Sequence, residues 1–294
     1  MINAFTIDVE DYYCLVRRHR LGCETPPSEA VDRCTRQLMD LLDRFRTKGT
    51  FFFLGEVARA YPQLVRDVAA GGHELGVHGF RHVPVYTLSP EQFRREIVDA
   101  KRCLEDLSGA PVVGHRAPAF SFRADTLWAF DVLLDEGFLY DSSVHPAAGV
   151  RYGWPGFLED IHEMTLPSGR KIVEAPMSVV HFLGRTLPAC GGGWLRHFPY
   201  GYTRWAMRRI SKRRPVIVYV HPHEIDTEPA PEYFRRELAQ AARAHKRHHR
   251  IQTRNRRTVM GKLEKLLGSY PFAPLRDVIG RALGRPLSTS VAEG

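Results

Sequence analysis

Short apolar segments alternate with helix-like segments along most of the chain, and this alternation constrains the fold more than any other feature. The segments at 4–9, 50–54 and 216–220 are largely apolar, which indicates strands that are buried on both faces. Between them, the spacing of apolar residues predicts helices over 29–47 and 56–70. Such alternation is typical of a parallel sheet covered by helices. The sequence has no G-x-G-x-x-G motif or phosphate-binding loop, which argues against a nucleotide-binding fold.

A helix-capping motif supports this alternation of strands and helices, whereas a later glycine- and proline-rich region interrupts it. The segment Ser89-Pro90-Glu91-Gln92 has the form of a capping box with proline at the first helical position. We expect the helix that begins there to bury Phe93, Ile97, Ala100 and Leu104. The region 145–200 is rich in glycine and proline, and the pattern predicts irregular structure over it.

Polar and charged side chains lie at the ends of the predicted strands. In chain order they are Asp8 and Glu10, His78 and His82, Arg116, Asp141 and His221. In a closed α/β barrel, the carboxyl ends of the strands face one pocket, and catalytic groups from different strands meet there. We therefore expect these residues to lie close together.

Two of these residues, His78 and His82, are four positions apart and follow the apolar residues Leu75 and Val77. On a helical or tightly turned segment, such residues share a face and could bind one metal ion through their imidazole nitrogens. The chain contains 14 histidines, so a pair with this spacing also arises by chance. The pair gains weight only if other segments supply a carboxylate ligand, a base and an acid.

Five segments supply these groups in a recognisable order. They are Thr6-Ile7-Asp8-Val9-Glu10-Asp11, His78-Gly-Phe-Arg-His82, His115-Arg116-Ala117-Pro118-Ala119-Phe120, Tyr140-Asp141-Ser142-Ser143 and Val220-His221-Pro222-His223-Glu224. Together they resemble the five motifs of the polysaccharide deacetylases, the NodB-homology enzymes of carbohydrate esterase family 4, over about 4–226. The resemblance implies a distorted (β/α)7 barrel that binds a divalent metal ion and removes acetyl groups from N-acetylated sugars.

The strings DVEDYY, GGGW and HPHEID most resemble the branch of this family that accompanies bacterial exopolysaccharide and exosortase loci. That branch carries a C-terminal extension of unknown function. The expected organisation is a NodB-homology domain at 1–226 followed by a basic, mostly helical extension at 227–294. Within the extension, five apolar residues predict helices docked on the barrel: Val259, Leu263, Leu266, Leu267 and Phe272.

The resemblance implies that His78, His82 and one carboxylate hold the metal ion, with Glu10 or Asp11 as the carboxylate. On a strand, Asp8 and Glu10 share a face, whereas Asp11 points with Val9 to the other side. This alternation favours Glu10. Zinc is the expected ion, with cobalt, nickel and manganese as alternatives.

The resemblance also implies the acid and base of the reaction. Asp8 would be the base, and Arg116 would orient it by a charge-assisted hydrogen bond and keep it ionised. His221 would be the general acid, with His223 as a minor rival. Asp141 would be the carboxylate that positions His221, although the tryptophan that often accompanies this fourth motif is missing.

Several residues are candidates for contact with the sugar. Pro118 and Phe120 belong to the third motif, and Trp154 and Trp194 offer aromatic faces that suit pyranose rings. Packing in the core is an alternative of nearly equal weight for each tryptophan. Arg151 is a weaker candidate for contact with a charged or hydroxyl-rich glycan.

The chain has a formal net charge of +9, and much of it is C-terminal. The basic segment 235–257 could attract anionic lipid head groups, an acidic polymer or nucleic acid without specificity, or could be a solvated helix face. No domain motif indicates specific nucleic-acid binding. The five scattered cysteines suggest reduced thiols. With no visible leader and no apolar run of about 18 residues, the sequence predicts a cytoplasmic protein, with peripheral contact at the inner membrane as a further expectation.

The leading hypothesis is a metal-dependent hydrolase that removes N-acetyl groups from N-acetylhexosamine units. Its expected partner is an N-acetylated polysaccharide, such as a bacterial exopolysaccharide, or its lipid-linked oligosaccharide precursor. One alternative is hydrolysis of another non-peptide C–N bond on the same barrel. Another is a non-catalytic glycan-binding module, although such a module needs no acid and base together. The sequence does not predict the oligomeric state.

Overall fold

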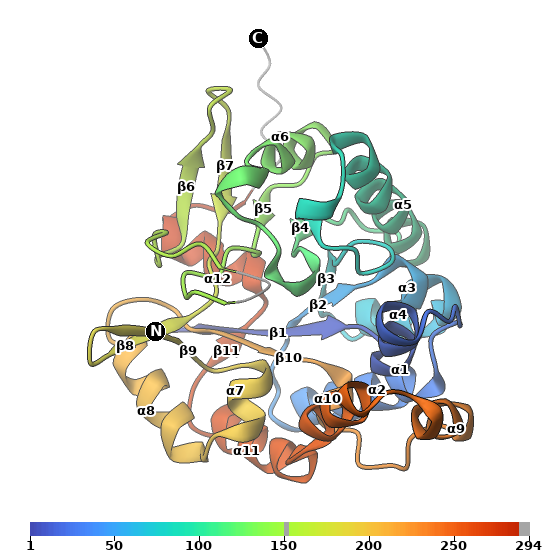
Figure 1. Cartoon of the computed structure of the whole chain (residues 1–294). Helices are drawn as coiled ribbons and strands as arrows, with labels where there is room; N and C mark the ends of the chain where they lie inside the picture. The colour runs from blue at the N-terminus through green and yellow to red at the C-terminus, as the bar shows by residue number, and fades with distance from the viewer. Residues whose placement is uncertain (150–152, 288–294) are drawn as a thin grey trace.

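The computed structural model describes residues 1–149 and 153–287, so Arg151 lies outside the described residues. Its centre is a curled sheet (Figure 1). In the described chain, seven parallel strands follow the order β10-β1-β2-β3-β4-β5-β7. They are β1 (Asn3–Val9), β2 (Thr50–Phe53), β3 (Glu74–Val77), β4 (Gly114–His115), β5 (Tyr140–Asp141), β7 (Lys171–Glu174) and β10 (Ile217–Val220). The predicted (β/α)7 fold is confirmed, in the form of a half-barrel.

Three further pairings complete the sheets. The strand β6 (His162–Thr165) pairs antiparallel with β7 at one edge. The strands β8 (Val179–Phe182) and β9 (Arg185–Pro188) form a separate hairpin. The short strand β11 (Phe272–Ala273) pairs with the first residues of β1. The prediction of irregular structure over 145–200 holds for the described residues up to 161 but was wrong from His162 onward, because four-residue strands give too short a pattern to recognise.

Helices pack around the sheet, and their bounds follow the apolar spacing. Those before β10 are α1 (Tyr12–Val16), α2 (Glu29–Arg44), α3 (Gly55–Ala60), α4 (Pro62–Ala70), α5 (Pro90–Ser108), α6 (Trp128–Asp135), α7 (Gly192–His197) and α8 (Tyr200–Ile210). At the start of α5 the predicted capping box forms, and its four predicted core residues are buried. The single helix predicted over 56–70 is two helices, because Pro62 disfavours helical geometry at Tyr61 and donates no hydrogen bond.

The C-terminal extension is made of α9 (Glu232–Gln240), α10 (Arg243–Thr253), α11 (Val259–Leu267) and α12 (Leu275–Leu283), together with β11. The five apolar residues expected to dock are all buried: Val259, Leu263, Leu266, Leu267 and Phe272. The extension thus shares the core of the half-barrel. The five cysteines are free. Among the described residues, no helix has the length and apolarity to cross a membrane.

Candidate metal centre and active site

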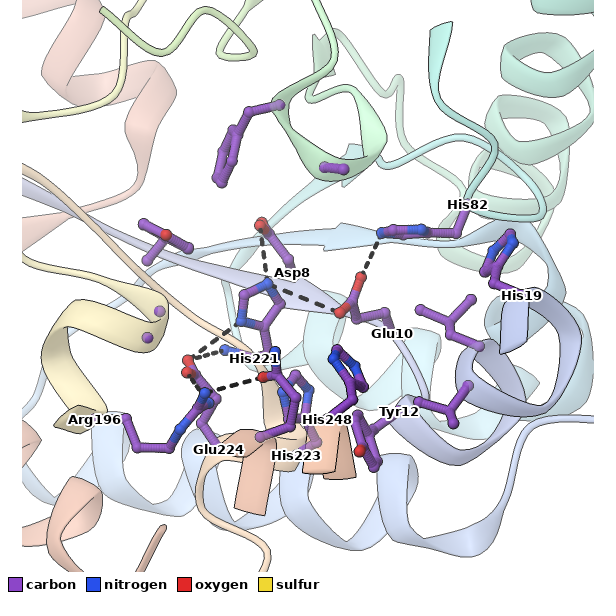
Figure 2. A pocket seen from close by; sticks show the side chains of 18 of the residues that line it. Asp8, Glu10, Tyr12, His19, His82, Arg196, His221, His223, Glu224 and His248 are labelled. Atoms are coloured by element: carbon purple, nitrogen blue, oxygen red, sulfur yellow. Dashed lines mark hydrogen bonds and ion pairs between the residues drawn. The ribbon is translucent and has the colours of Figure 1, made fainter. Parts of the chain in front are cut away.

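The carboxyl ends of the central strands open into one cavity of about 590 Å³. Asp8 lies in β1 and Glu10 follows it, while His78 follows β3 and His221 follows β10. With His82, these side chains line the cavity. Figure 2 shows Asp8, Glu10, His82 and His221 around it. The polar groups that the sequence places at separate strand ends therefore meet, as expected for parallel strands with a common edge.

Glu10, His78 and His82 form a compact group of potential metal ligands, with one ligand atom from each residue within 4.8 Å of the others. Glu10 Oε2 lies 2.8 Å from His82 Nε2 and 3.8 Å from His78 Nε2. The backbone of the connecting loop is left-handed at Gly79, with φ of 75°, and at His82, with φ of 60°. This tight turn, rather than a helix, brings the two imidazoles together.

The hydrogen bonds of this group leave its ligand atoms free. His78 Nδ1 lies 2.8 Å from the carbonyl oxygen of Arg116, which can only accept, so Nδ1 carries the proton and Nε2 keeps its lone pair. Glu10 Oε2 is buried and faces His82 Nε2 at 2.8 Å, but no described residue donates to it with hydrogen-bond geometry. A buried carboxylate oxygen without a donor is costly unless a cation binds it. The residues present therefore fit a divalent metal ion.

The charges around Glu10 keep its carboxylate ionised, as a metal ligand must be. Burial alone would raise the pKa of this carboxyl, but His82 and His221 hold its pKa well below the ordinary value. Asp11 is placed differently, because its side chain accepts from the backbone nitrogens of Cys14 and Ser28 and caps α1. The geometry thus favours Glu10 over Asp11 as the ligand.

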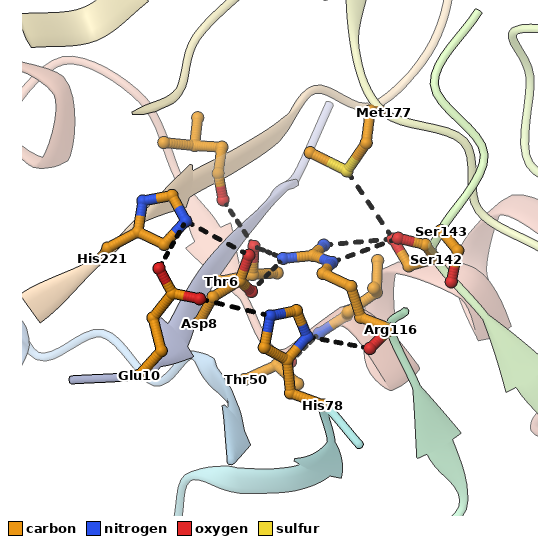
Figure 3. A network of polar contacts seen from close by, with 12 residues as sticks. Thr6, Asp8, Glu10, Thr50, His78, Arg116, Ser142, Ser143, Met177 and His221 are labelled. Carbon is orange, nitrogen blue, oxygen red and sulfur yellow. Dashed lines mark hydrogen bonds and ion pairs between the residues drawn. The ribbon is translucent and has the colours of Figure 1, made fainter. Parts of the chain in front are cut away.

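Asp8 is held by Arg116, which is fully buried (Figure 3). Arg116 Nη1 donates to Asp8 Oδ1 at 2.7 Å and to Thr6 Oγ1 at 2.7 Å. Its Nε and Nη2 donate to the carbonyl and hydroxyl of Ser142, each at 3.1 Å, and its guanidinium lies over the ring of Phe52. Asp8 Oδ2 remains directed at the cavity, 3.9 Å from His221 Nε2. Arg116 therefore positions Asp8 without reaching the cavity itself.

The carboxylate that positions His221 is Glu224, not Asp141 as predicted. His221 Nδ1 lies 3.2 Å from Glu224 Oε2, and Arg196 Nη1 donates to Glu224 Oε1 at 2.6 Å. Burial lowers the pKa of His221, but Glu10, Glu224 and Asp8 outweigh that effect and raise it to about 9. His221 is therefore a cation at neutral pH, with Nε2 facing both Asp8 and Glu10 at 3.9 and 3.8 Å.

Asp141 serves a structural role instead. Its Oδ1 lies 2.6 Å from His115 Nδ1 and also accepts from the hydroxyl of Ser143, and its Oδ2 accepts from the Ser143 backbone. All three residues are fully buried. The short strand β5 ends at Asp141, whose side chain contacts His115 of β4. His221 follows β10, which is separated from β5 by β1 to β4 in the sheet, so Asp141 does not hold it.

The four predicted sugar contacts divide evenly. Phe120 and Trp194 line the cavity, whereas Pro118 and Trp154 do not. Pro118 is buried and packs against the turn at Gly79. Trp154 packs against Phe157, with ring centroids 4.8 Å apart. For Trp154 the alternative of core packing is the better description.

A second potential metal group consists of His221, His223 and Glu224. Here the carboxylate already accepts from Arg196 and from the backbone nitrogen of His221. His223 is half-buried beside Tyr12, with ring centroids 5.2 Å apart. Because its carboxylate is committed to donors, this group is a weaker fit for a metal ion than Glu10, His78 and His82.

Sequence reasoning missed the residues that other elements add to the cavity. Helix α10 contributes His248, Ile251 and Gln252, and α7 contributes Arg196. Gln252 Oε1 accepts from Arg196 Nη2 at 2.9 Å, so α10 supports the arginine that holds Glu224. The H-x-x-E spacing in HPHEID is the one sequence pattern that could have indicated Glu224. No local sequence pattern indicates that residues of α10 line the cavity.

Two family models match the chain. The polysaccharide deacetylase model matches residues 26–132, and a domain of unknown function, DUF3473, matches residues 142–280. The second match begins directly after β5 and so includes α7, α8 and the β8–β9 hairpin as well as the extension. The predicted division of the chain at 226/227 stays a prediction.

Curated relatives match over limited segments. A peptidoglycan-N-acetylglucosamine deacetylase of Bacillus cereus is 32% identical over 75 residues, which are 26% of this chain and 27% of the relative. A chitooligosaccharide deacetylase of Rhizobium leguminosarum is 33% identical over 94 residues, which are 32% of this chain and 44% of the relative. The alignments thus span less than half the length of these relatives.

Solved structures match over nearly the whole chain. A Mycobacterium smegmatis protein assigned to the polysaccharide deacetylases has a TM-score of 0.60 at 19% identity, covering 100% of this chain and 94% of that one. A family 4 carbohydrate esterase from Streptomyces lividans has a TM-score of 0.50 at 13% identity, covering 93% and 91%. At these identities the structures establish the shared fold.

Proposed function

Because this chain carries a polysaccharide deacetylase domain of the NodB type, we propose that it hydrolyses the N-acetyl group of N-acetylhexosamine units in a glycan. The observation that carries the proposal is the placement of three ligand-like side chains beside a carboxylate and an imidazolium in one cavity. The names of the curated relatives support an N-acetylated sugar as substrate.

The metal ion would be held by Glu10, His78 and His82, and zinc is proposed over cobalt, nickel or manganese because two imidazoles and one carboxylate suit it. A divalent cation bound there supplies a Lewis acid for the acetyl carbonyl. The turn at Gly79 and the hydrogen bond from His78 Nδ1 fix the direction of the imidazoles before any ion binds.

Asp8 and His221 then divide the proton transfers of amide hydrolysis. Asp8 Oδ2 takes a proton from the attacking water, while Arg116 keeps the carboxylate in place through Oδ1. His221, oriented by Glu224 and kept cationic by Glu10 and Glu224, gives its Nε2 proton to the departing amine nitrogen. Phe120 and Trp194 supply apolar faces for the sugar ring on the cavity wall.

We further propose a bacterial exopolysaccharide, or its lipid-linked oligosaccharide precursor, as the natural substrate, and a cytoplasmic location. The basic segment 235–257 contains α10, which lines the cavity, so its exposed cations are well placed to attract an acidic glycan. Peripheral contact of this segment with an anionic membrane, and nonspecific contact with nucleic acid, are the weaker proposals for it.

Acetate release from N-acetylated oligosaccharides, with zinc added, tests the function. The wild-type protein should release acetate, and Asp8→Asn should reduce the rate at least about a hundredfold, since general base catalysis typically contributes that much. Equal turnover by the variant would remove Asp8 as the base. Tight sugar binding without turnover would favour a glycan-binding module, and turnover only of other amides would favour a different C–N hydrolase.

The zinc content of purified variants tests whether Glu10 or its neighbour Asp11 is the metal ligand. Glu10→Gln should lose bound zinc after dialysis, because an amide oxygen replaces the charged ligand. Asp11→Asn, the matched control, should retain zinc, since Asp11 caps α1. Loss of zinc from Asp11→Asn alone would reverse the assignment.

A further inference from the structure

The tip of the β8–β9 hairpin exposes two large apolar side chains. Leu183 is 85% exposed and Phe182 is 53% exposed. Phe182 packs edge-on against Trp205 of α8, with ring centroids 5.8 Å apart, so the tip is anchored on that helix. In Figure 1 the hairpin projects beside α8 at the edge of the molecule. The exposed leucine adds nothing to the folded core.

The backbone of the turn makes this leucine more unusual. Leu183 and Gly184 are both left-handed, with φ of 47° and 72°, and they form the two-residue connection of the hairpin. Such a turn favours asparagine before glycine, and a leucine there is strained. Position 183 therefore holds an apolar side chain that neither burial nor backbone geometry explains.

The same surface is strongly cationic. No aspartate or glutamate occurs between Glu174 and Glu224. Six cations of this stretch are exposed and have no ion pair with a described residue: Arg185, Arg204, Arg208, Arg209, Lys212 and Arg213. Glu159, which lies beside several of these cations, is already paired with Arg214 and contacts His181. The hairpin tip and these cations are called here the hairpin–α8 surface.

A row of aromatic side chains joins this surface to the catalytic cavity. Ring centroids are 4.6 Å apart for Trp194 and Phe198, 5.1 Å for Phe198 and Tyr202, and 5.7 Å for Tyr202 and Trp205. Trp194 lines the cavity, and Trp205 contacts the hairpin tip. Aromatic side chains mixed with cations are characteristic of proteins that lie at the boundary between lipid and water.

We propose that the hairpin–α8 surface binds the surface of an anionic lipid bilayer, with Leu183 and Phe182 inserted among the lipids. A bilayer matches both features, because its head groups pair with the cations and its interior accepts the apolar tip. A soluble acidic polymer would match the cations alone. The contact brings the mouth of the cavity close to the membrane and does not depend on catalysis, so it can hold even if the proposed reaction fails.

Vesicle binding tests the proposal. The protein should sediment with vesicles of phosphatidylcholine mixed with phosphatidylglycerol, but not with phosphatidylcholine alone. Its tryptophan emission should shift to the blue as Trp205 leaves water. Leu183→Asn should weaken the binding about tenfold, since a leucine side chain no longer enters the lipid. Asparagine suits the left-handed turn, so the variant should fold at least as well as the wild type.

Charge-reversal variants test whether the cations of the hairpin–α8 surface contribute to vesicle binding. The double variant Arg208→Glu/Lys212→Glu should lose at least about tenfold in vesicle binding. The matched variant Arg247→Glu/Arg250→Glu changes the net charge equally but alters exposed residues of α10, and it should lose much less. Equal losses in both would show attraction by net charge only. If Leu183→Asn bound vesicles as tightly as the wild type, the surface would be a site for polyanions. If the wild type were a dimer and Leu183→Asn a monomer, the surface would contact a second copy of the chain. Either result overturns the proposal.

Discussion

At the residue scale, Glu224 orients His221 and, after Glu10, does most to raise its pKa. It contacts His221 Nδ1 and is itself held by Arg196 and, through Arg196, by Gln252. The H-x-x-E spacing is visible in the sequence, but the three-residue turn that folds Glu224 back onto His221 is not. Without that turn, Asp141 was the natural choice by resemblance, and its burial against His115 could not be foreseen.

Replacing Glu224 by glutamine should shift the pH dependence of activity. Glu10 and Glu224 together raise the pKa of His221 to about 9, so the general acid is lost only as the pH rises through that value. In Glu224→Gln the pKa falls, and the alkaline limb of the kcat/KM profile should move to lower pH, with a rate loss of about 10- to 100-fold at neutral pH. The measurement is acetate release as a function of pH.

The control for this experiment is Glu228→Gln, the same substitution at an exposed residue four positions further along. It should leave the profile in place. If the alkaline limb of Glu224→Gln coincided with that of the wild type, Glu224 would not be the group that holds His221 protonated. A lower rate at every pH, without a shift, would indicate damage to structure instead.

At the scale of elements, the loop after β3 does the most to build the metal group. Gly79 has a φ of 75°, and a Cβ there would lie 3.2 Å from Pro118 Cγ. Gly79→Ala should therefore strain the loop, displace His82 and weaken zinc binding about tenfold or more. The measurement is zinc affinity, followed by the rise in Tm on adding zinc.

Gly169→Ala is the matched control for the loop. Gly169 also has a positive φ, of 81°, but a Cβ there would meet nothing within 4 Å. It should cost about 1 kcal/mol of stability through its backbone and leave zinc affinity unchanged. An equal fall in zinc affinity for both variants would mean that general strain, not the placement of His82, controls binding.

The elements also show what sequence patterns could and could not predict. Long segments with clear periodicity, such as α2 and the capping box of α5, were predicted correctly because local spacing determines them. The four-residue strands β6–β9 were missed, since each is stabilised by its partner rather than by its own pattern. The polar residues at the predicted strand ends were correctly expected to lie close together. The residues of α10 reach the cavity only through tertiary packing, which the sequence does not show.

For the whole molecule, the packing that forms the site also buries neutral histidines away from it. Burial lowers the pKa of His73, 7% exposed, and of His145, 2% exposed, to about 4 in each case. His73 Nδ1 accepts from the backbone nitrogen of Gly49, which also favours the neutral ring. These residues tie the stability of the entire fold to pH, whatever happens in the active site.

The sign of this dependence follows from the direction of the shift. In the unfolded chain a histidine binds its proton near pH 6.5, whereas these two bind it near pH 4 when folded. Their contribution to the free energy of unfolding is complete above about pH 6.5 and is lost as the pH falls toward 4, by about 1.4 kcal/mol per pH unit for each residue. In His73→Asn, Oδ1 can accept the Gly49 hydrogen bond without titrating. Urea unfolding should therefore show a shallower fall in stability between pH 6.5 and 4 for this variant, and a fall as steep as in the wild type would show that His73 does not contribute.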